Sequence, residues 1–207
     1  MSHSNALIIF MKAPRLGKVK TRMQPQLSER QSLGLYKAMG LDLVNQFSDA
    51  STYDVMIYFW PPQSEEEMQS WLGDDKIYSP QLGNDLGEKM HQAFTENFNG
   101  SYQKVVIIGS DLPTLDETII QEAFRHLNEH DAVLGPTEDG GYYLIALNKP
   151  QPELFKNVRW SSESVLPQTL ENADKAGLSV HLLEQRTDID TYDEVEQLRA
   201  TLQQSPS

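Results

Sequence analysis

The chain has 207 residues, of which 39% are hydrophobic and 23% charged; this suits one folded α/β domain over residues 1–207 and excludes a largely disordered chain. A net charge of −13 repels phosphate backbones and argues against a general nucleic-acid binder, but not against one nucleotide held by a local basic loop and a metal ion. The lack of cysteine excludes disulfides, thiolate zinc sites and cysteine catalysis. No apolar run is long enough for a membrane span and no export signal is visible, so we expect a cytoplasmic protein, with its oligomeric state left open.

Apolar runs alternate with amphipathic segments along the chain. The predicted strands are Ala6–Met11, Tyr53–Trp60, Lys76–Ser79, Lys104–Gly109, Ala132–Leu134, Tyr142–Leu147 and Ser179–Leu183. The predicted helices are one capped by Ser28 and ending near Phe47, Glu65–Trp71 capped by Ser64, one opened by Asn84 and ending near Phe98, one capped by Asp116 and ending near Glu129, one capped by Ser161 or Ser162 and ending near Ala176, and Tyr192–Leu202. This alternation predicts a three-layer α/β/α domain with a mostly parallel, Rossmann-like sheet, followed by a frayed tail at Gln203–Ser207.

A basic loop follows the first predicted strand. Five of the 17 basic residues fall within eleven positions, namely Lys12, Arg15, Lys18, Lys20 and Arg22. Beyond the carboxyl end of a parallel strand such a loop can hold the phosphates of a nucleotide, an interpretation we prefer to a solvated, charge-balancing loop. The chain has neither a complete P-loop nor a Gly-x-Gly-x-x-Gly motif, so neither a kinase-type nor a Rossmann dinucleotide site is supported.

Acidic residues follow two of the predicted strands. Asp111 comes directly after the apolar run Val105–Gly109 and Ser110. Asp188 and Asp190 follow the last predicted strand. Open α/β sheets bind ligands at the carboxyl edge, where these carboxylates could hold Mg²⁺ or Mn²⁺ on a nucleotide. Asp111 could also cap the turn before Pro113, and Asp190 could cap the last helix.

Two further motifs have competing explanations. Asp139-Gly140-Gly141 could orient a sugar or activate a hydroxyl, with glycines that let backbone approach a ligand, or could be a plain hairpin turn. His126-Leu-Asn-Glu129-His130 matches the inverted zincin pattern, but the dipole at a helix C-terminus also favours histidine, and we prefer that explanation.

As an ordered set, these motifs resemble one family. They are Lys18–Arg22, Gly83–Met90, Ile108–Pro113, Gly135–Ile145, Trp160-Ser161 and Asp188–Thr191. The sequence resembles the bacterial DUF2064 group of glycosyltransferase-A-like proteins, also described as similar to 2-phospho-lactate guanylyltransferase, from about Leu7 to Leu198. The resemblance implies a nucleotide-diphospho-sugar transferase fold.

The resemblance also implies roles for individual residues. It places a metal on Asp111 and, by analogy, on Asp190 with Asp188 close by, and it implies nucleotide contacts at Lys18, Lys20, Arg22, Asp85 and Glu88. The residues themselves add Lys12 of the basic loop as a nucleotide contact, Asp111 and Asp139 as catalytic candidates, and Gly140, Gly141, Trp160 and Ser161 as substrate contacts. One departure stands out, because glycosyltransferases of this fold usually carry Asp-x-Asp where this chain has Ser110-Asp111-Leu112.

Three hypotheses follow for the function. The first is a metal-dependent transferase with a nucleotide-sugar donor, that is, a glycosyltransferase. The second is a nucleotidyltransferase that joins a nucleoside triphosphate to a small phosphorylated metabolite and releases pyrophosphate. The third is a nucleotide or metabolite binder without turnover, which the single carboxylate at Asp111 keeps open.

Overall fold

The computed structural model describes residues 3–204, and the backbone alone for residues 201–204. Its strands are β1 (Asn5–Lys12), β2 (Asp54–Trp60), β3 (Ile77–Pro80), β4 (Lys104–Gly109), β5 (Ala132–Pro136), β6 (Tyr142–Leu147) and β7 (Val180–Leu182). Its helices are η1 (Thr21–Met23), α1 (Glu29–Phe47), α2 (Glu65–Leu72), α3 (Leu86–Asn99), α4 (Glu117–His126), η2 (Pro152–Phe155), α5 (Val165–Lys175) and α6 (Tyr192–Gln204). No helix within the described residues is both long and apolar enough to span a bilayer.

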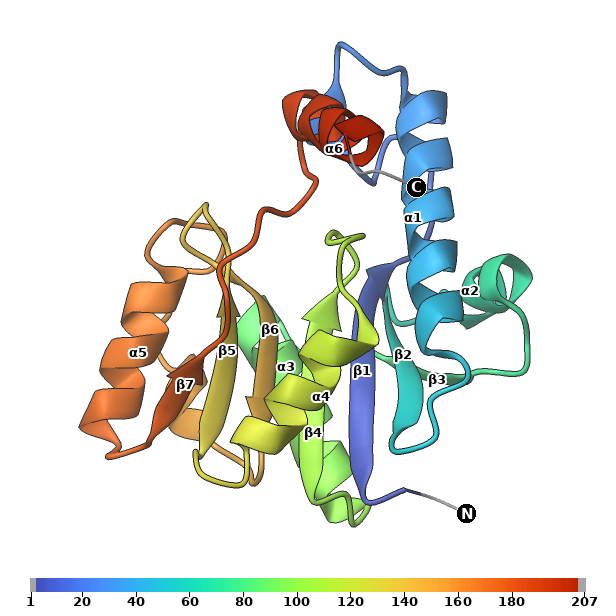
Figure 1. Ribbon diagram of the computed structural model, residues 1–207. Helices are drawn as coiled ribbons and strands as arrows, with labels where there is room; N and C mark the ends of the chain where they lie inside the picture. Colours follow the sequence, from blue (N-terminus) through green and yellow to red (C-terminus); the bar gives the residue numbers. More distant parts are fainter. Residues whose placement is uncertain (1–2, 205–207) are drawn as a thin grey trace.

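The seven strands form one sheet in the order β3-β2-β1-β4-β6-β5-β7, in which only β6 runs antiparallel to its neighbours. After β1 the chain builds β2 and β3 on one side, and then returns to place β4 on the other side of β1. The strand order therefore reverses between β1 and β4, and ligands bind open sheets beyond the carboxyl ends of such strands (Figure 1). The predicted mostly parallel sheet is confirmed.

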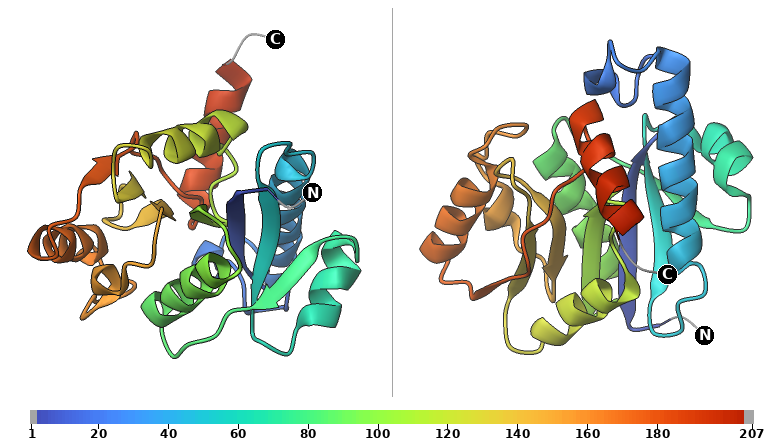
Figure 2. Two further views of the ribbon diagram at one scale, coloured as in Figure 1. Left: turned by 90° about the horizontal axis from the view of Figure 1, so that it is seen from below. Right: turned by 45° about the horizontal axis from the view of Figure 1, so that its top comes forward.

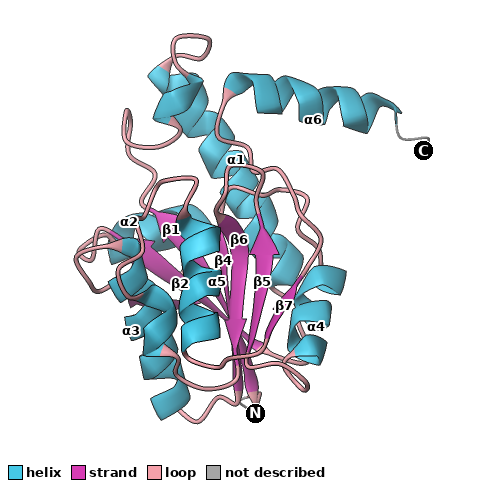
Figure 3. Ribbon diagram, turned by 90° about the vertical axis from the view of Figure 1, so that its left-hand side faces the viewer, coloured by secondary structure: helices cyan, strands magenta, loops and turns pink. Residues whose placement is uncertain are grey.

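Helices cover both faces of the sheet, as expected (Figure 3). Alternate residues of β1 face opposite sides: Leu7 and Ile9 join a core with α1, α2 and α4, whereas Ala6 and Ile8 join a core with α3, η2 and α5. This alternation follows from the two-residue period of a strand buried on both faces.

Helix α6 belongs to neither layer. It lies across the carboxyl edge beside the upper part of α1 (Figure 2). A small third core joins Met23 and Met39 to Ile189, with Val195 and Leu198 of α6 packed against it. The C-terminal segment is thereby held over the edge of the sheet that carries the basic loop.

Most of the predicted element boundaries agree with the structure to within two residues. Ser28 caps α1 as expected, in a capping box with Gln31, and Asp116 caps α4 by accepting from the backbone N–H of Ile119. Helix α4 ends at His126 instead of Glu129, although turn-type hydrogen bonds continue from His126 to His130. Helix α6 runs to Gln204, into the predicted frayed tail, whose residues 205–207 lie outside the described part of the chain.

Three predicted helix starts differ from the structure in position or in capping. Asp85, not Asn84, caps α3, because its carboxylate accepts from the backbone N–H of Glu88. Ser64 stands at the cap position of α2 but makes no side-chain cap bond, because its hydroxyl accepts a hydrogen bond from Arg15. Helix α5 begins only after Ser164, because residues 161–164 turn beside a cavity instead of starting the helix.

Candidate active site

The loop after β1 carries Lys20 into the interior. Its beginning is fixed by Tyr36 of α1, whose hydroxyl accepts from the N–H of Lys12 and donates to the carbonyl of the same residue. Lys20 itself has a φ of 48°, in the left-handed region that a lysine seldom occupies. Non-glycine residues in such conformations cluster at functional sites.

The ammonium of Lys20 joins two acidic segments. Its Nζ lies 2.6 Å from Asp111 Oδ1 and 3.1 Å from Asp190 Oδ1, and it also donates to the carbonyl of Ile189. Only 3% of the lysine side chain is exposed. A backbone hydrogen bond of 2.8 Å from Ile189 to Asp111 holds the two segments side by side. The predicted proximity of Asp111 and Asp190 is therefore present, with a lysine between them.

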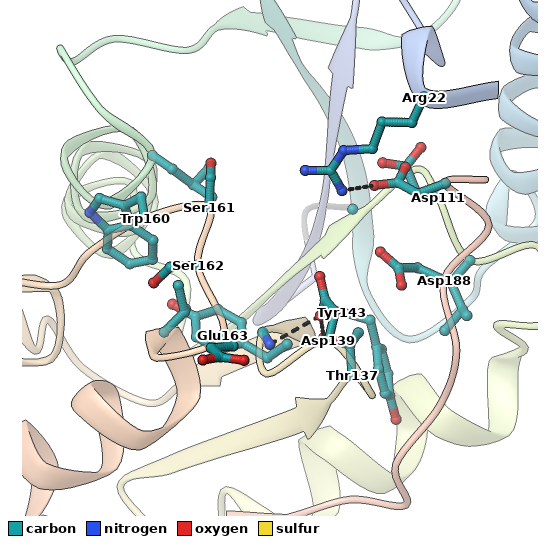
Figure 4. A pocket seen from close by; sticks show the side chains of 17 residues that line it. Arg22, Asp111, Thr137, Asp139, Tyr143, Trp160, Ser161, Ser162, Glu163 and Asp188 are labelled. Carbon is teal, nitrogen blue, oxygen red and sulfur yellow. Dashed lines mark hydrogen bonds and ion pairs between the residues drawn. The ribbon is translucent and has the colours of Figure 1, made fainter. Parts of the chain in front are cut away.

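A cavity of about 460 Å³ opens beside this cluster, within the usual size range of ligand pockets. The carboxylates of Asp111 and Asp188 lie on one side of it, and Trp160 and Ser161 lie on the other, with Arg22 at its rim (Figure 4). Arg22 Nη1 is 3.2 Å from Asp190 Oδ2, yet 66% of its side chain remains exposed, so the guanidinium can still reach a bound anion. The sequence-predicted residues that line the cavity are Arg22, Asp111, Asp139, Gly141, Trp160, Ser161, Asp188 and Asp190.

Asp188 carries negative charge that its surroundings do not balance. Burial, together with the nearby charges of Asp190, Asp139 and Asp111, raises the pKa of its carboxyl group to about 6. Figure 4 shows Asp111, Asp139 and Asp188 facing a common space. A cation that binds among these carboxylates would relieve their mutual repulsion and so stabilise the site.

The residues present fit a hard divalent cation. Asp111, Asp188 and Asp190 offer only carboxylate oxygens, the ligands that Mg²⁺ and Mn²⁺ accept. Asp188 is free of an ion pair within the described residues, whereas Asp111 and Asp190 already share Lys20. A cation would then be held by Asp188 together with the second oxygen of Asp111, and Asp190 would join it when Arg22 releases the Oδ2 atom.

The Asp139 motif is a turn whose carboxylate has one oxygen in use. Asp139 Oδ1 accepts from the Thr137 hydroxyl at 2.5 Å and from the N–H of Gly141 at 3.1 Å. Gly140 has a φ of 86°, and a side chain there would meet the carbonyl oxygen of Glu163 at 2.2 Å. The turn predicted as the structural alternative is thus present, and it also aims Asp139 at the cavity.

The opposite wall depends on Trp160 and Ser161. The indole packs against the α3–α5 side core and against Gly87, where an added Cβ would lie 2.4 Å from the ring. Ser161 has a φ of 61°, so both the wall and the Lys20 loop contain a non-glycine residue in the left-handed region.

Other predicted site residues do not line this cavity. Lys18 lines a neighbouring cavity of about 320 Å³ beside Trp60, and Lys12 lines both that one and a cavity of about 290 Å³ that it shares with Lys20, Asp111 and Asp190. Asp85 and Glu88 line none of these cavities and instead cap α3, since the Glu88 carboxylate accepts from the N–H and the amide of Asn84. Gly140 does not line the cavity and instead packs against the backbone of Glu163.

The interpretation of two charged groups needs correction. Arg15 of the basic loop forms an ion pair of 2.5 Å with Glu67 of α2 and lines the same cavity as Lys12 and Lys18, so Glu67 competes with phosphates for its guanidinium. Glu67 thereby anchors the loop to α2.

Sequence reasoning missed several residues that line the cavity, namely Leu86, Thr137, Tyr143, Ser162 and Glu163. Thr137 and Tyr143 flank the Asp139 turn and could have been found from that motif. Leu86 lies within the Gly83–Met90 motif and could have been found from it. Glu163 carries no sequence signal, because only the meeting of α3 with the turn before α5 brings it to the site.

Fold and site together define an α/β protein with an acidic and basic ligand pocket at a sheet switch point. The profile of the family described as "Uncharacterized protein conserved in bacteria (DUF2064)" matches residues 43–162. The chain belongs to this family, which confirms the resemblance found in the sequence.

Proteins similar to the chain include transferases. A candidate nucleotide-diphospho-sugar transferase from Desulfovibrio desulfuricans G20 is 33% identical, with a TM-score of 0.93 over 99% of this chain and 90% of that one. The 2-phospho-L-lactate guanylyltransferase of Methanothermobacter thermautotrophicus is 27% identical over 133 residues, which are 64% of this chain but only 58% of that protein. Rv0371c of Mycobacterium tuberculosis, solved with manganese, is 12% identical and shares the fold, with a TM-score of 0.55 over 96% of this chain and 98% of that one.

Proposed function

We propose that the protein is a nucleotidyltransferase that joins a nucleoside triphosphate to a small phosphorylated metabolite and releases pyrophosphate. The observation that carries the proposal is Lys20, buried between Asp111 and Asp190 at the carboxyl edge of β1 and β4. Lys20 and the carboxylates place positive and negative side chains next to one another around the site. A triphosphate that arrives with a divalent cation needs both kinds of side chain.

The basic loop would bind the triphosphate. Arg22 at the rim offers a guanidinium that can bond two phosphate oxygens at once, and Lys18 lies earlier in the same loop beside a second cavity. Lys20 would act differently, because its buried ammonium fixes the directions of Asp111 and Asp190 instead of reaching the ligand. A bound Mg²⁺ or Mn²⁺ would neutralise charge on the phosphates.

The reaction needs little acid–base chemistry from the protein. An oxygen of the acceptor phosphate forms the new bond to the α-phosphorus, and the bond from that phosphorus to the bridging oxygen breaks as pyrophosphate takes the electron pair. A phosphate monoester is largely ionised at neutral pH and can attack without a general base. Asp139 would therefore orient a hydroxyl of the nucleotide or acceptor through its remaining oxygen.

A nucleotide-sugar transferase, the first hypothesis from the sequence, is the second candidate. It is favoured by Trp160, whose ring forms an apolar wall opposite the carboxylates and could pack on a sugar face. The 33% identical protein from D. desulfuricans, described as a candidate nucleotide-diphospho-sugar transferase, supports it too. The missing Asp-x-Asp pair at Ser110-Asp111-Leu112 counts against it.

The test is a binding screen followed by turnover. Thermal shifts with nucleoside mono-, di- and triphosphates and nucleotide sugars, each with Mg²⁺, Mn²⁺ or EDTA, should show the largest metal-dependent stabilisation with one triphosphate. That triphosphate is then incubated with a panel of phosphorylated sugars, alcohols and hydroxy acids, and pyrophosphate is measured. Release that requires both acceptor and metal supports the proposal. Release of nucleoside diphosphate from a nucleotide sugar would transfer the assignment to the second candidate, and no nucleotide binding at all would overturn both.

A further inference from the structure

Three of the five histidines converge at a place remote from the cavity. His126 and His130 come from the end of α4, and His181 comes from β7. One ligand nitrogen from each ring lies within 4.8 Å of those of the other two. We call this group the histidine cluster.

The fold explains why they meet. Val180 of β7 packs with the α3–α5 side core, so the alternation of the strand turns His181 to the other face, which α4 covers. His126 and His130 are four residues apart, and the N–H of His130 donates to the carbonyl of His126 at 3.0 Å, which continues the helical turn. In Figure 1 this end of α4 points away from the edge of the sheet that carries the candidate active site.

The three rings pack together without bonding to one another. The rings of His126 and His181 stack with centroids 3.5 Å apart, and His130 lies 5.3 Å from His181. Among the described residues, the Nδ1 atom of His130 is buried with no hydrogen-bond partner. An unpartnered buried nitrogen in a group of imidazoles costs free energy that a coordinated cation would recover.

Charged neighbours define the rest of the cluster. Glu122, one turn before His126, places its Oε1 atom 3.7 Å from His126 Nε2. Its carboxylate oxygen can supply a fourth ligand beside the three imidazole nitrogens. Arg125 donates to the same nitrogen at 3.1 Å, but 66% of its side chain is exposed, so it can swing into solvent. Burial, together with His126 and His130, lowers the pKa of His181, which favours the neutral form that binds metals.

We propose that His126, His130 and His181 form a site for a transition-metal ion, Zn²⁺ in the first instance, with Glu122 or water as the fourth ligand. Imidazole ligands suit Zn²⁺, Ni²⁺ and Cu²⁺, whereas Mg²⁺ and Mn²⁺ prefer the oxygen ligands of the active-site carboxylates. Tetrahedral zinc with Zn–N bonds of about 2.0–2.1 Å needs nitrogens about 3.4 Å apart, and those of the cluster lie within 4.8 Å of one another. Because the rings of His126 and His181 are stacked, one of them must turn out of the stack for both nitrogens to face the ion. The ion would tie the edge strand β7 to α4.

The test uses untagged full-length protein stripped of metal and titrated with Zn²⁺ in excess Mg²⁺, which occupies the carboxylates. Calorimetry should give one equivalent of Zn²⁺ and a raised melting temperature. Co²⁺ should give the visible absorption of a tetrahedral site. His181→Gln and His126→Gln should weaken Zn²⁺ binding by at least about 100-fold, since loss of an outer-shell partner alone costs 10–100-fold.

Two variants serve as controls. His3→Gln should leave Zn²⁺ affinity unchanged, because His3 contacts Asp54 far from the cluster. Arg125→Gln alters only an exposed side chain and should tighten binding several-fold by removing a competing cation. The proposal is overturned if His181→Gln, with an unchanged circular dichroism spectrum, binds Zn²⁺ as the parent does. Nucleotide assays do not enter this test, so it stands apart from the proposed function.

Discussion

Replacing Asp188 by asparagine should stabilise the metal-free protein at neutral pH while removing its response to metal and nucleotide. The pKa of this carboxyl group is raised to about 6, from 3.8 in an unfolded chain, first by burial and then by Asp190, Asp139 and Asp111. Each unit corresponds to about 1.36 kcal/mol, so the full shift would cost about 3 kcal/mol. The side chain is only half-buried, and solvent screening reduces this to about 1–2 kcal/mol.

The sign follows from proton binding. Between about pH 4 and pH 6 the folded protein keeps a proton on Asp188 that the unfolded chain releases, so the free energy of unfolding falls as the pH rises through this window. The cost is absent below the window and complete above it. Asp188→Asn should therefore match the parent near pH 4 and exceed it by about 1–2 kcal/mol at pH 7.5, which raises the melting temperature by about 2–8 °C.

The assay is thermal or urea unfolding in EDTA at several pH values between 4 and 8. Asp74→Asn, an exposed acid on the loop between α2 and β3, controls for the loss of one negative charge. A second set of melts with Mg²⁺ and the preferred nucleotide should show stabilisation of the parent and of Asp74→Asn, but not of Asp188→Asn. Equal pH profiles for parent and Asp188→Asn would refute the electrostatic reasoning, and a retained metal response would remove Asp188 from the cation site.

Three further outcomes are expected. Asp111→Asn should abolish metal-dependent nucleotide binding in calorimetry with an unchanged circular dichroism spectrum; persistence of the metal dependence would show that the cation is held elsewhere. Arg22→Ala should weaken triphosphate binding about tenfold, the value of one exposed charge-assisted contact, and leave nucleoside binding unchanged; equal losses for both ligands would contradict a phosphate role. Gly140→Ala should lower the melting temperature by several degrees because its Cβ would lie 2.2 Å from the Glu163 carbonyl, whereas Gly177→Ala, with positive φ but open space, should cost only about 1 kcal/mol; similar losses would argue against a tight turn at Asp139.

The core of the fold could be predicted because its signals are local. The apolar runs of β1 and β4 are buried on both faces, and such strands read as continuous hydrophobic segments. Ser28 and Asp116 cap their helices as their residue types indicate. The wrong cap at Ser161 and Ser162 has a tertiary cause, because the turn there is fixed by contacts with Gly140 that no local pattern records.

The acidic residues of the site could be predicted from the sequence, but the buried lysine between them could not. Asp111 and Asp190 follow strands, and the edge rule brings them together. That Lys20 would be buried between them, while Arg15 turns away to Glu67, depends on a left-handed backbone conformation and on packing of the C-terminal segment. His126 and His130 were visible as a pair, but the third histidine arrives from β7, 51 residues later.

The contact of Lys20 with Ile189 and Asp190 joins positions 169 and 170 residues apart. Contacts of such long sequence separation form late, because the entropy of closing the intervening loop must be overcome first. During synthesis the sheet strands β1 to β7 would all leave the ribosome before the two acidic segments could be joined. A chain stopped before Ile189 would therefore retain every strand of the sheet yet leave Asp111 and Lys20 without their C-terminal partners, so the pocket assembles only after the segment that carries Asp190 has been made.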